Sequence, residues 1–457
     1  EPIGPSSILV LLFRPMKPLS LFFLLPLFAC LSLFADPLSL AVPVAEPLSL
    51  AVLVAEPLSL AELVDIALKN NPETEKVWSN VKRAQAAIGV AKSDEYPHLN
   101  ASGSLTHARE VKFPNGPNTV FTSYGAELNL NYLLCDFGET RAAVRATKEA
   151  LQSAKWWADF AIQKIIAEVA ADYYEYLNAS QLLLTREDSF QDAKMILDAA
   201  DELFKAGLRA SNDSITAKAA VAEIQMGLAQ QKADVAIAYG KLLIALGLPI
   251  ETRLQIQTAA EGIQNPLFKE GIATLIQSAE EHRADLMAKR ASLSEMNAYV
   301  TQARRAPLPK LRALGQGGWL EYGKHRGNGY NYSAGVALDI PLFQGFKYSY
   351  LQKQALANAE MTGAELKELQ NQIAFEVLSY SERVKAAEEA MHYSGEFFGD
   401  ASRSYGCSIE GYKAGLINIF DLLHSQRFLA DARIKNAQAR TEWLVALSQL
   451  AFAIGSK

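Results

Sequence analysis

The sequence predicts an α+β protein that is mostly helical and consists of two tandem repeats. Two observations support this fold class. The chain carries the similar stretches FKAGL at residues 204–208 and YKAGL at 412–416, each between a very long helical pattern and a shorter one. Ahead of each long pattern lie two runs of alternating residues that are typical of β-strands. We therefore expect each repeat to contribute long coiled-coil-like helices and two strands, which makes four strands per chain.

The composition excludes several classes of protein. Of the 457 residues, 50% are hydrophobic and 21% are charged, so the chain is neither disordered nor highly charged. Its net charge of −6 gives no reason to expect nucleic acid as a partner. The three cysteines, Cys30, Cys135 and Cys407, form no CxxC or Cys/His metal spacing. We therefore expect no metal site, no disulfide scaffold and no cofactor.

Residues 1–35 differ in kind from the rest of the chain and are predicted to be a secretory signal peptide. Arg14 and Lys17 precede an almost wholly apolar run at residues 19–35. Met16 is a candidate start, which would make residues 1–15 an upstream extension. A membrane anchor is the alternative, but the run is short for a span. Cys30 could carry a lipid if residues 27–30 (LFAC) are a lipoprotein processing site, or it could lie inside a cleaved signal peptide.

Residues 36–56 are predicted to be a leader made of decapeptide repeats. Three decapeptides, beginning at Asp36, Glu46 and Glu56, each start with an acidic residue followed by PLSLA. Only the third continues into a convincing helical pattern, in which Ser59 is a cap candidate and Glu62 follows three residues later. We therefore expect the first structural repeat at residues 57–262 and the second at residues 263–457.

Four strands are predicted from alternation, at about residues 98–109, 120–134, 311–322 and 330–342. Aromatic residues gather near one end of the second pair, as in the strands of a transmembrane β-barrel: Trp319, Tyr322, Tyr330 and Tyr332. Soluble hairpins carry a similar pattern, so both interpretations stay open at this point. If the strands span a membrane, several chains must share one barrel, because the smallest outer-membrane barrels have about eight strands.

Two helical patterns are far longer than a globular core can cover. Residues 138–205 and about 346–412 lack proline, and at ~1.5 Å per residue each run reaches about 100 Å. Apolar residues in the first run follow a spacing near the 3.5 residues of coiled coils. The returning helices are expected at about residues 212–246 and 418–454.

A turn joins each long helix to its returning helix. The turns are placed near Gly207 and Gly415, because glycine adopts without strain the left-handed conformation that commonly ends a helix. Each repeat is thus expected to contribute one helical hairpin.

Taken together, these segments resemble a known family. Residues 58–72 (LSLAELVDIALKNNP), the strand-to-helix passages at 133–138 (LLCDFG) and 341–345 (PLFQG), the two KAGL turns and the duplication are similar to the TolC-type outer-membrane efflux protein (outer membrane factor) family. The resemblance covers residues 57–457. It implies a homotrimer whose chains share a twelve-stranded β-barrel in the outer-membrane lipid and continue as an α-helical tunnel through the periplasm.

The resemblance also implies a function and partners. It predicts a passive exit duct of a tripartite efflux or type I secretion system in a Gram-negative-type bacterium. The tips of the helical hairpins would dock on a periplasmic adaptor (membrane-fusion) protein bound to an inner-membrane transporter.

The family gates its channel at these tips, and four residues match the positions involved. Asp421 and His424 match an acidic ring at the constriction, and one helical turn separates them. Three copies of Asp421 would repel one another unless hydrated, protonated or bound to a cation, while a protonated His424, which replaces the usual acid, would add positive charge. Asp213 and Tyr412 match positions that link the two hairpins, whereas Ile417 stands where the family can carry an arginine. From the residues alone, Asp213 could equally be an acid stabilised by a helix N-terminus, and Tyr412 could simply pack.

An enzyme is not expected. The chain has no HExxH motif and no nucleophile elbow, and residues 315–318 (GQGG) lack the Lys-Ser/Thr of a phosphate loop. The alternative to a channel is an exported coiled-coil structural or adhesin-like protein. The sequence leaves open whether a channel of this kind would carry drugs, metals or a secreted protein.

Overall fold

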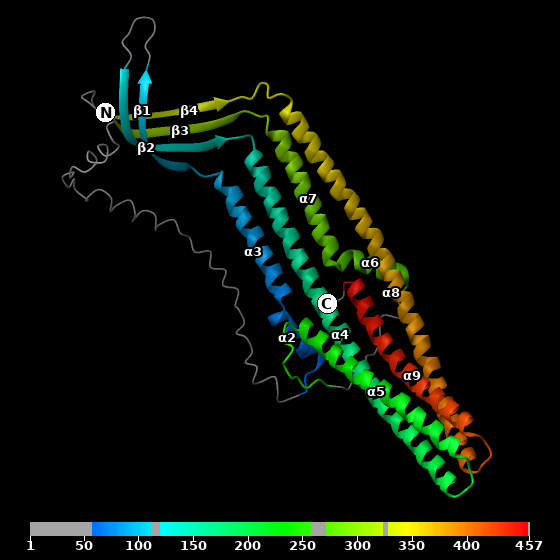
Figure 1. Cartoon of the computed structure of the whole chain (residues 1–457). Coiled ribbons are helices and arrows are strands. Elements are labelled where there is room, and N and C mark those ends of the chain that lie inside the picture. The colour runs from blue at the N-terminus through cyan, green and yellow to red at the C-terminus, as the bar shows by residue number, and fades with distance from the viewer. Residues whose placement is uncertain (1–56, 111–118, 258–270, 323–327, 456–457) are drawn as a thin grey trace, which may run out of the picture. The chain divides into compact units, whose positions relative to one another are not determined.

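The computed structural model describes residues 57–110, 119–257, 271–322 and 328–455 (Figure 1). The predicted signal peptide, the decapeptide leader and Cys30 lie outside these residues. In chain order the described elements are α2 (Leu60–Asn70), α3 (Pro72–Ser93), β1 (His98–Glu110), β2 (Thr119–Cys135), α4 (Glu139–Lys205), α5 (Ser211–Ala245), α6 (Ile272–His282), α7 (Ala284–Arg305), β3 (Lys310–Tyr322), β4 (Asn328–Asp339), α8 (Lys347–Lys413) and α9 (Ile419–Ala453).

The two halves of the chain contain the same elements in the same order. Each half begins with an 11-residue helix (α2, α6) and a 22-residue helix (α3, α7). Two strands follow, and each half ends with a 67-residue helix (α4, α8) and a 35-residue helix (α5, α9). The predicted fold class, a mostly helical α+β chain with two tandem repeats and four strands, is confirmed.

Local sequence signals set several helix ends. Ser59 and Glu62 form the expected capping box at the start of α2. Asn71 then accepts a hydrogen bond from the N–H of Glu73 at 2.9 Å and caps α3, whose first residue is proline. α4 and α8 end before Gly207 and Gly415, which have φ values of +74° and +79°.

One strand boundary differs from the sequence prediction. β4 runs from Asn328 to Asp339, whereas alternation predicted about 330–342. Pro341 explains the earlier end, because proline has no N–H to donate to a neighbouring strand.

The sequence did not predict the backbone conformation of the passages into the long helices. Each contains two consecutive left-handed residues, Phe137 and Gly138 in the first repeat, and Gly345 and Phe346 in the second.

The four strands form one antiparallel sheet in the order β1-β2-β3-β4. The central pairing of β2 with β3 joins the two repeats, and Ala126 lies opposite Trp319 in its register. β1 and β4 are therefore the edge strands of the sheet within one chain. Residues directly opposite each other in such a register lie on the same face.

This register separates polar from apolar side chains. One face carries a mostly polar set, including His98, Asn100, Ser102, Ser123, Glu127, Asn129, Asn131, Lys310, Arg312, Gln316, Asn331 and Ser333. The opposite face carries mostly apolar and aromatic residues, including Leu99, Ala101, Leu105, Tyr124, Leu128, Leu130, Tyr132, Leu311, Trp319, Tyr330, Tyr332, Val336 and Leu338.

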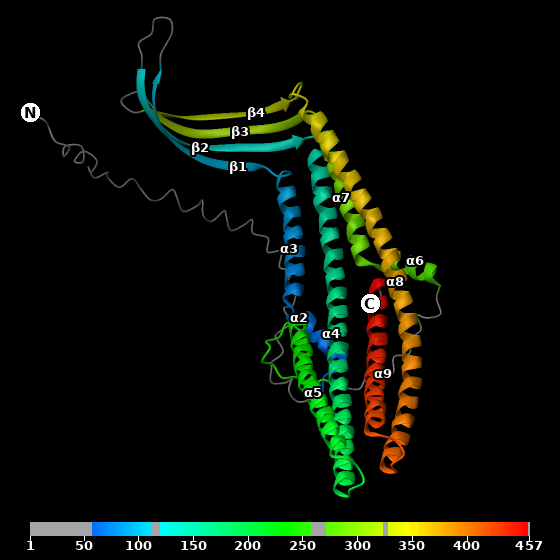
Figure 2. The ribbon, with the colours of Figure 1, turned by 45° about the vertical axis from the view of Figure 1, so that its right-hand side comes forward.

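The helices run away from the sheet in a fixed order. α3, α4, α7 and α8 lie side by side, as the contacts between successive members and Figure 2 show. α5 folds back on α4 and α9 folds back on α8, so both hairpin turns lie at the end of the helices away from the sheet. α9 also contacts α4, which joins the two hairpins. No helix in the described part of the chain is both long enough and apolar enough to cross a membrane.

The junctions between the short and the long helices also repeat. At the first junction, Asn71 donates a side-chain hydrogen bond to the carbonyl of Ala245 near the end of α5, at 2.9 Å. At the second, Arg283 donates to the carbonyl of Ala453 at the end of α9, at 3.4 Å. In each half, the residue between the 11-residue and the 22-residue helix thus binds the last turn of the returning helix, but the side chain differs: an asparagine in the first half and an arginine in the second.

Candidate functional site

The two hairpin turns form a site in which side chains of one repeat contact the other. The hydroxyl of Tyr412, at the end of α8, donates a hydrogen bond to Oδ2 of Asp213 at 3.1 Å. Asp213 lies in the first turn of α5, where a carboxylate is also favoured by the helix dipole. Tyr412 is fully buried in a hydrophobic cluster that includes Ile196 and Leu422. The fold therefore brings Asp213 and Tyr412 together, although 199 positions separate them.

The surroundings of Tyr412 hold its hydroxyl in the protonated form. Burial, the hydrogen bond to Asp213 and the negative charge of Asp213 together raise the pKa of Tyr412 from 10.0 to about 12. The folded chain thus favours the neutral phenol more than the unfolded chain does. This contribution to stability is fully present below about pH 10 and is lost as the pH rises towards about 12.

A pH series on Tyr412→Phe tests this assignment. The difference in unfolding midpoint between the wild-type chain and the variant is expected to stay constant from about pH 7 to about pH 9. It should shrink above about pH 10, where the unfolded-state phenol of Tyr412 begins to ionise. Denaturant unfolding of the detergent-solubilised chain, followed by circular dichroism, measures the difference, because every other titrating group is common to both proteins. A difference that already shrinks below about pH 9 would contradict the raised pKa.

Asp421 and His424 lie on a different surface from the Tyr412–Asp213 contact. Both are exposed on the first turns of α9, while Leu422 and Leu423 between them are buried. The backbone N–H of Asp421 donates to the side chain of Asn418 at 2.9 Å, which fixes the start of the helix. The ring of His424 stacks on Phe428, with ring centroids 6.4 Å apart. Within one chain, the four predicted residues thus form one hydrogen-bonded, partly buried pair and one exposed pair.

Three arginines that link the two helical hairpins were not singled out from the sequence. Arg209, in the first turn, donates to the carbonyl of Ile417 in the second turn at 2.7 Å. Further along the helices, Arg427 pairs with Glu223 on α5 at 2.6 Å, on the surface. Arg433 pairs with Asp192 on α4, also at 2.6 Å, with both side chains largely buried. The one sequence signal for Arg209 is its position two residues after Gly207, which corresponds to Ile417 two residues after Gly415.

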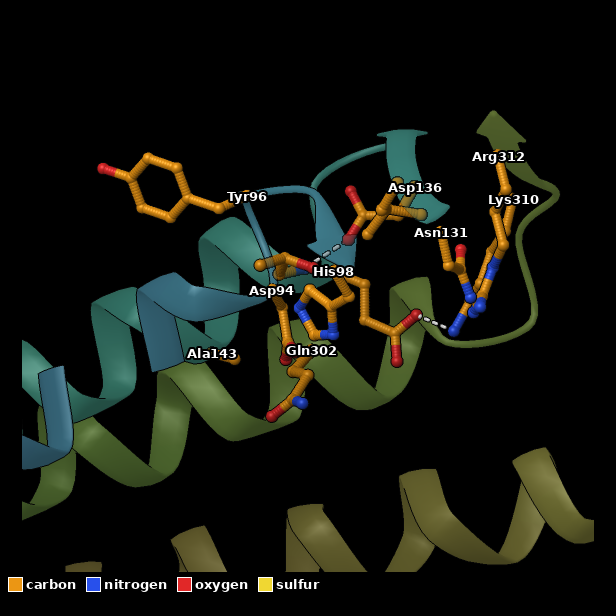
Figure 3. A pocket seen from close by; sticks show the side chains of 12 residues that line it. Asp94, Tyr96, His98, Asn131, Asp136, Ala143, Gln302, Lys310 and Arg312 are labelled. Atoms are coloured by element: carbon orange, nitrogen blue, oxygen red, sulfur yellow. Dashed lines mark hydrogen bonds and ion pairs between the residues drawn. The ribbon is translucent and has the colours of Figure 1, made fainter. Parts of the chain in front are cut away.

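A second polar region lies where the sheet meets the helices. A cavity of about 230 Å³ there is lined mostly by charged and polar side chains from the strand–helix junctions around it, among them Asp136, Lys310 and Arg312 (Figure 3). Lys310 pairs with Glu139 at 2.6 Å, which ties the start of β3 to the start of α4. No cluster of three or more potential metal-binding side chains occurs among the residues that the structure describes.

Asp136 organises the passage from β2 into α4 beside this cavity. Its two carboxylate oxygens accept hydrogen bonds from the N–H groups of Gly138, at 2.8 Å, and Thr140, at 2.5 Å. Burial raises the pKa of Asp136, but hydrogen bonds from Thr140 and Gly138 outweigh this effect, so the pKa lies below its ordinary value. The ionised side chain is thus built into the turn that redirects the chain from sheet to helix.

Comparison with known proteins places this geometry in context. The model of a family described as "Outer membrane efflux protein" matches residues 63–248 and 275–456. Protein CyaE of Bordetella pertussis is 26% identical over 399 residues, which cover 84% of this chain and 82% of CyaE. The outer membrane protein TolC of Escherichia coli is 23% identical over 403 residues, covering 85% of this chain and 80% of TolC. The crystal structure of the Campylobacter jejuni CmeC outer membrane channel superposes with a TM-score of 0.76 at 19% identity, covering 87% of this chain and 85% of CmeC.

Proposed function

The chain belongs to the outer membrane efflux protein family and lies in the outer membrane, and from this we propose that it is the exit duct of a tripartite efflux or type I secretion system. Solutes pass through it passively, and the energy comes from the inner-membrane transporter. The observation that carries the proposal is the register of the sheet, which gives one polar face and one apolar face. A sheet of this kind separates water from lipid.

The apolar face fits a membrane. Tyr330 and Tyr332 on this face are each 90% exposed, and Trp319 packs edge-on against Tyr124 with ring centroids 5.9 Å apart. Exposed aromatic residues grouped at one end of the strands are typical of the aromatic belt at a membrane surface. Lipid would cover these side chains, and the polar face would line a water-filled lumen.

The open edges of the sheet support a homotrimer. Among the residues that the structure describes, β1 and β4 each have one edge without a partner strand, and an exposed edge favours pairing with another chain. Three copies, joined β4 to β1, would supply twelve strands and close a shared barrel.

The exposed surfaces of α3 and α8 also support a trimer. α3 has no buried residue within the chain, and α8 exposes apolar side chains that a neighbouring copy would cover: Tyr350, Leu356, Met361, Phe375 and Leu378.

The hairpin turns are the proposed docking point for the periplasmic adaptor. Leu208 and Leu416 occupy equivalent positions in the two turns and are 71% and 81% exposed. Exposed leucines at both tips offer an apolar contact to a partner protein. The adaptor would connect the duct to the inner-membrane transporter.

The proposed gate lies at the same end of the helices. In a trimer, the exposed Asp421 side chains would meet around the axis, where like charges repel unless a cation or a proton intervenes. His424, one turn further on, would reduce the negative charge when protonated. Tyr412 and Asp213 would hold the two hairpins of each copy in the closed arrangement.

Replacing Asp421 by alanine is expected to raise the conductance and to weaken block by added cations by about tenfold, because a charge interaction of about 1.4 kcal/mol is removed. Single-channel recording in planar bilayers measures both quantities. Asp431→Ala is the matched control, because Asp431 is exposed on the same helix and pairs with Lys435 at 3.0 Å. Unchanged conductance and block in Asp421→Ala would remove Asp421 from the gate.

The channel function itself is tested with the wild-type protein. Heat-modifiable trimers in the outer-membrane fraction, together with ion conductance in planar bilayers, are the expected result. An exported coiled-coil scaffold or adhesin would conduct no ions. A soluble monomer without conductance would therefore overturn the proposal.

A further inference from the structure

Arg209 takes part in a closed circuit of contacts between the two hairpin turns. Its guanidinium group donates to the carbonyl oxygen of Ile417 at 2.7 Å, from the first repeat to the second. Tyr412 donates to Asp213 at 3.1 Å, from the second repeat to the first. The Cζ atom of Arg209 lies 5.1 Å from the centre of the Tyr412 ring, which connects these two hydrogen bonds.

The two repeats are not equivalent at this position. Arg209 and Ile417 each lie two residues after the left-handed glycine of their turn. Only the first repeat carries a cation at this position. The guanidinium group of Arg209 donates to the backbone carbonyl of Ile417, the residue at the equivalent position of the second repeat. The side chain of Ile417 instead belongs to the apolar cluster around Tyr412 and lies against Gly411 of its own hairpin.

The chemistry of arginine suits both contacts. A guanidinium group is planar, so its edge can donate hydrogen bonds while its face covers an aromatic ring. The edge of Arg209 reaches a carbonyl oxygen between the end of α8 and the cap of α9. The guanidinium group also lies over the ring of Tyr412, and the hydroxyl of the same ring donates to Asp213.

We propose that Arg209 latches the second hairpin to the first and so determines how readily the periplasmic entrance opens. The inference rests on the proposed channel function and adds a regulatory residue to the same site. Each returning helix packs mainly on its own long helix, α5 on α4 and α9 on α8. Separating the two turns breaks the Arg209–Ile417, Arg209–Tyr412 and Tyr412–Asp213 contacts together. Arg209 is therefore a positioning residue that acts within one chain, whereas Asp421 acts between copies.

Single-channel recording of Arg209→Ala tests the latch. The open probability is expected to rise about tenfold, because a hydrogen bond to a charged group and a cation–π contact are lost together. Cation block through Asp421 should persist in this variant, which separates the latch from the acidic ring. Arg403→Ala is the matched control, because Arg403 is exposed and pairs with Asp400 on its own helix. That control should behave like the wild type.

A double-mutant cycle shows whether Arg209 acts through Tyr412. Tyr412→Leu removes the ring and the hydroxyl, so adding Arg209→Ala to it should raise the open probability much less than about tenfold. Equal effects of Arg209→Ala in both backgrounds would contradict coupling through the ring.

Hydrogen exchange provides a readout that does not depend on conduction. In the full detergent-solubilised chain, Arg209→Ala is expected to speed exchange of the amides in the first turns of α9 by about tenfold relative to Arg403→Ala. Arg209→Lys, which keeps the charge but not the planar group, should fall between the wild type and Arg209→Ala, and it replaces Arg209→Ala if that variant does not assemble. A wild-type protein that conducts no ions would overturn the channel function. The hydrogen-exchange comparison would then still show whether Arg209 holds the two hairpins together. If both Arg209 variants exchange their amides at the wild-type rate and keep the wild-type open probability, the latch is overturned but the channel function is not.

Discussion

Replacing Leu128 by arginine is expected to keep the protein out of the outer membrane, whereas replacing the next residue, Asn129, by arginine should not. The two side chains lie at adjacent positions near the middle of β2 but on opposite faces of the sheet. Leu128 is exposed on the apolar face, where lipid would surround it. An arginine facing lipid near the bilayer midplane costs about 2–4 kcal/mol in each copy, whereas a position facing the lumen leaves the charge in water.

The experiment compares the two variants in the same strain. The amount of heat-modifiable trimer in the outer-membrane fraction is the measured quantity, with expression of each precursor as the reference. Leu128→Arg should reduce the trimer strongly, and Asn129→Arg should retain it while changing ion selectivity through an added positive charge. Equal amounts of trimer in both variants would mean that the two faces of the sheet do not separate lipid from water.

Replacing Arg283 by alanine is expected to lower the free energy of unfolding by about 3–5 kcal/mol, because it leaves buried charge without its partner. The side chains of Arg283 and Asp285 are each 5% exposed, and their closest contact is 2.7 Å. Arg283 also pairs with Glu376 on α8 at 2.6 Å and reaches the carbonyl of Ala453. One side chain thus ties the α6–α7 junction to α8 and to the end of α9.

Denaturant unfolding of the detergent-solubilised chain measures this effect. Arg290→Ala is the matched control, because Arg290 is exposed on α7, the helix that Arg283 precedes, and should change stability by less than about 0.5 kcal/mol. Replacing Arg283 and Asp285 together by apolar residues should recover much of the loss, since neither charge then remains buried alone. An Arg283→Ala chain that unfolds at the wild-type midpoint would show that the network contributes little.

Much of the fold could be predicted because its signals are local. The box formed by Ser59 and Glu62, the proline after Asn71 and the glycines at 207 and 415 each act within a few residues, so one sequence is enough to place helix ends near them. The entry segment with Ser59, the strand-to-helix passages and the two KAGL turns, taken together with the duplication, also identified the family. The end of β4 was placed three residues too far because alternation continues past Asp339, although Pro341 cannot join the ladder.

The candidate site could be predicted only in part. Asp213 and Tyr412 came from the resemblance, and the residues alone allowed a helix-dipole role for one and a packing role for the other. Only its position two residues after Gly207 could have marked Arg209, and that signal is weak because an arginine after a helical turn is ordinarily a solvated side chain. Its partner is a backbone carbonyl 208 positions away, and no sequence pattern marks which carbonyl a side chain will reach.

The sequence by itself determined the duplication, the lengths of the helices and the alternation of the strands, because periodicity and caps depend on neighbouring residues. The tertiary structure alone decided which strands pair, and therefore that Glu127 shares a face with Gln316 on β3 while Leu128 lies on the other. It also decided that Arg209, Ile417, Tyr412 and Asp213 meet at one end of the helices. The physical reason is that these contacts join residues far apart in the sequence, so they depend on how strands and helices pack against one another. A shift of one residue in register would move each of these side chains away from its partner.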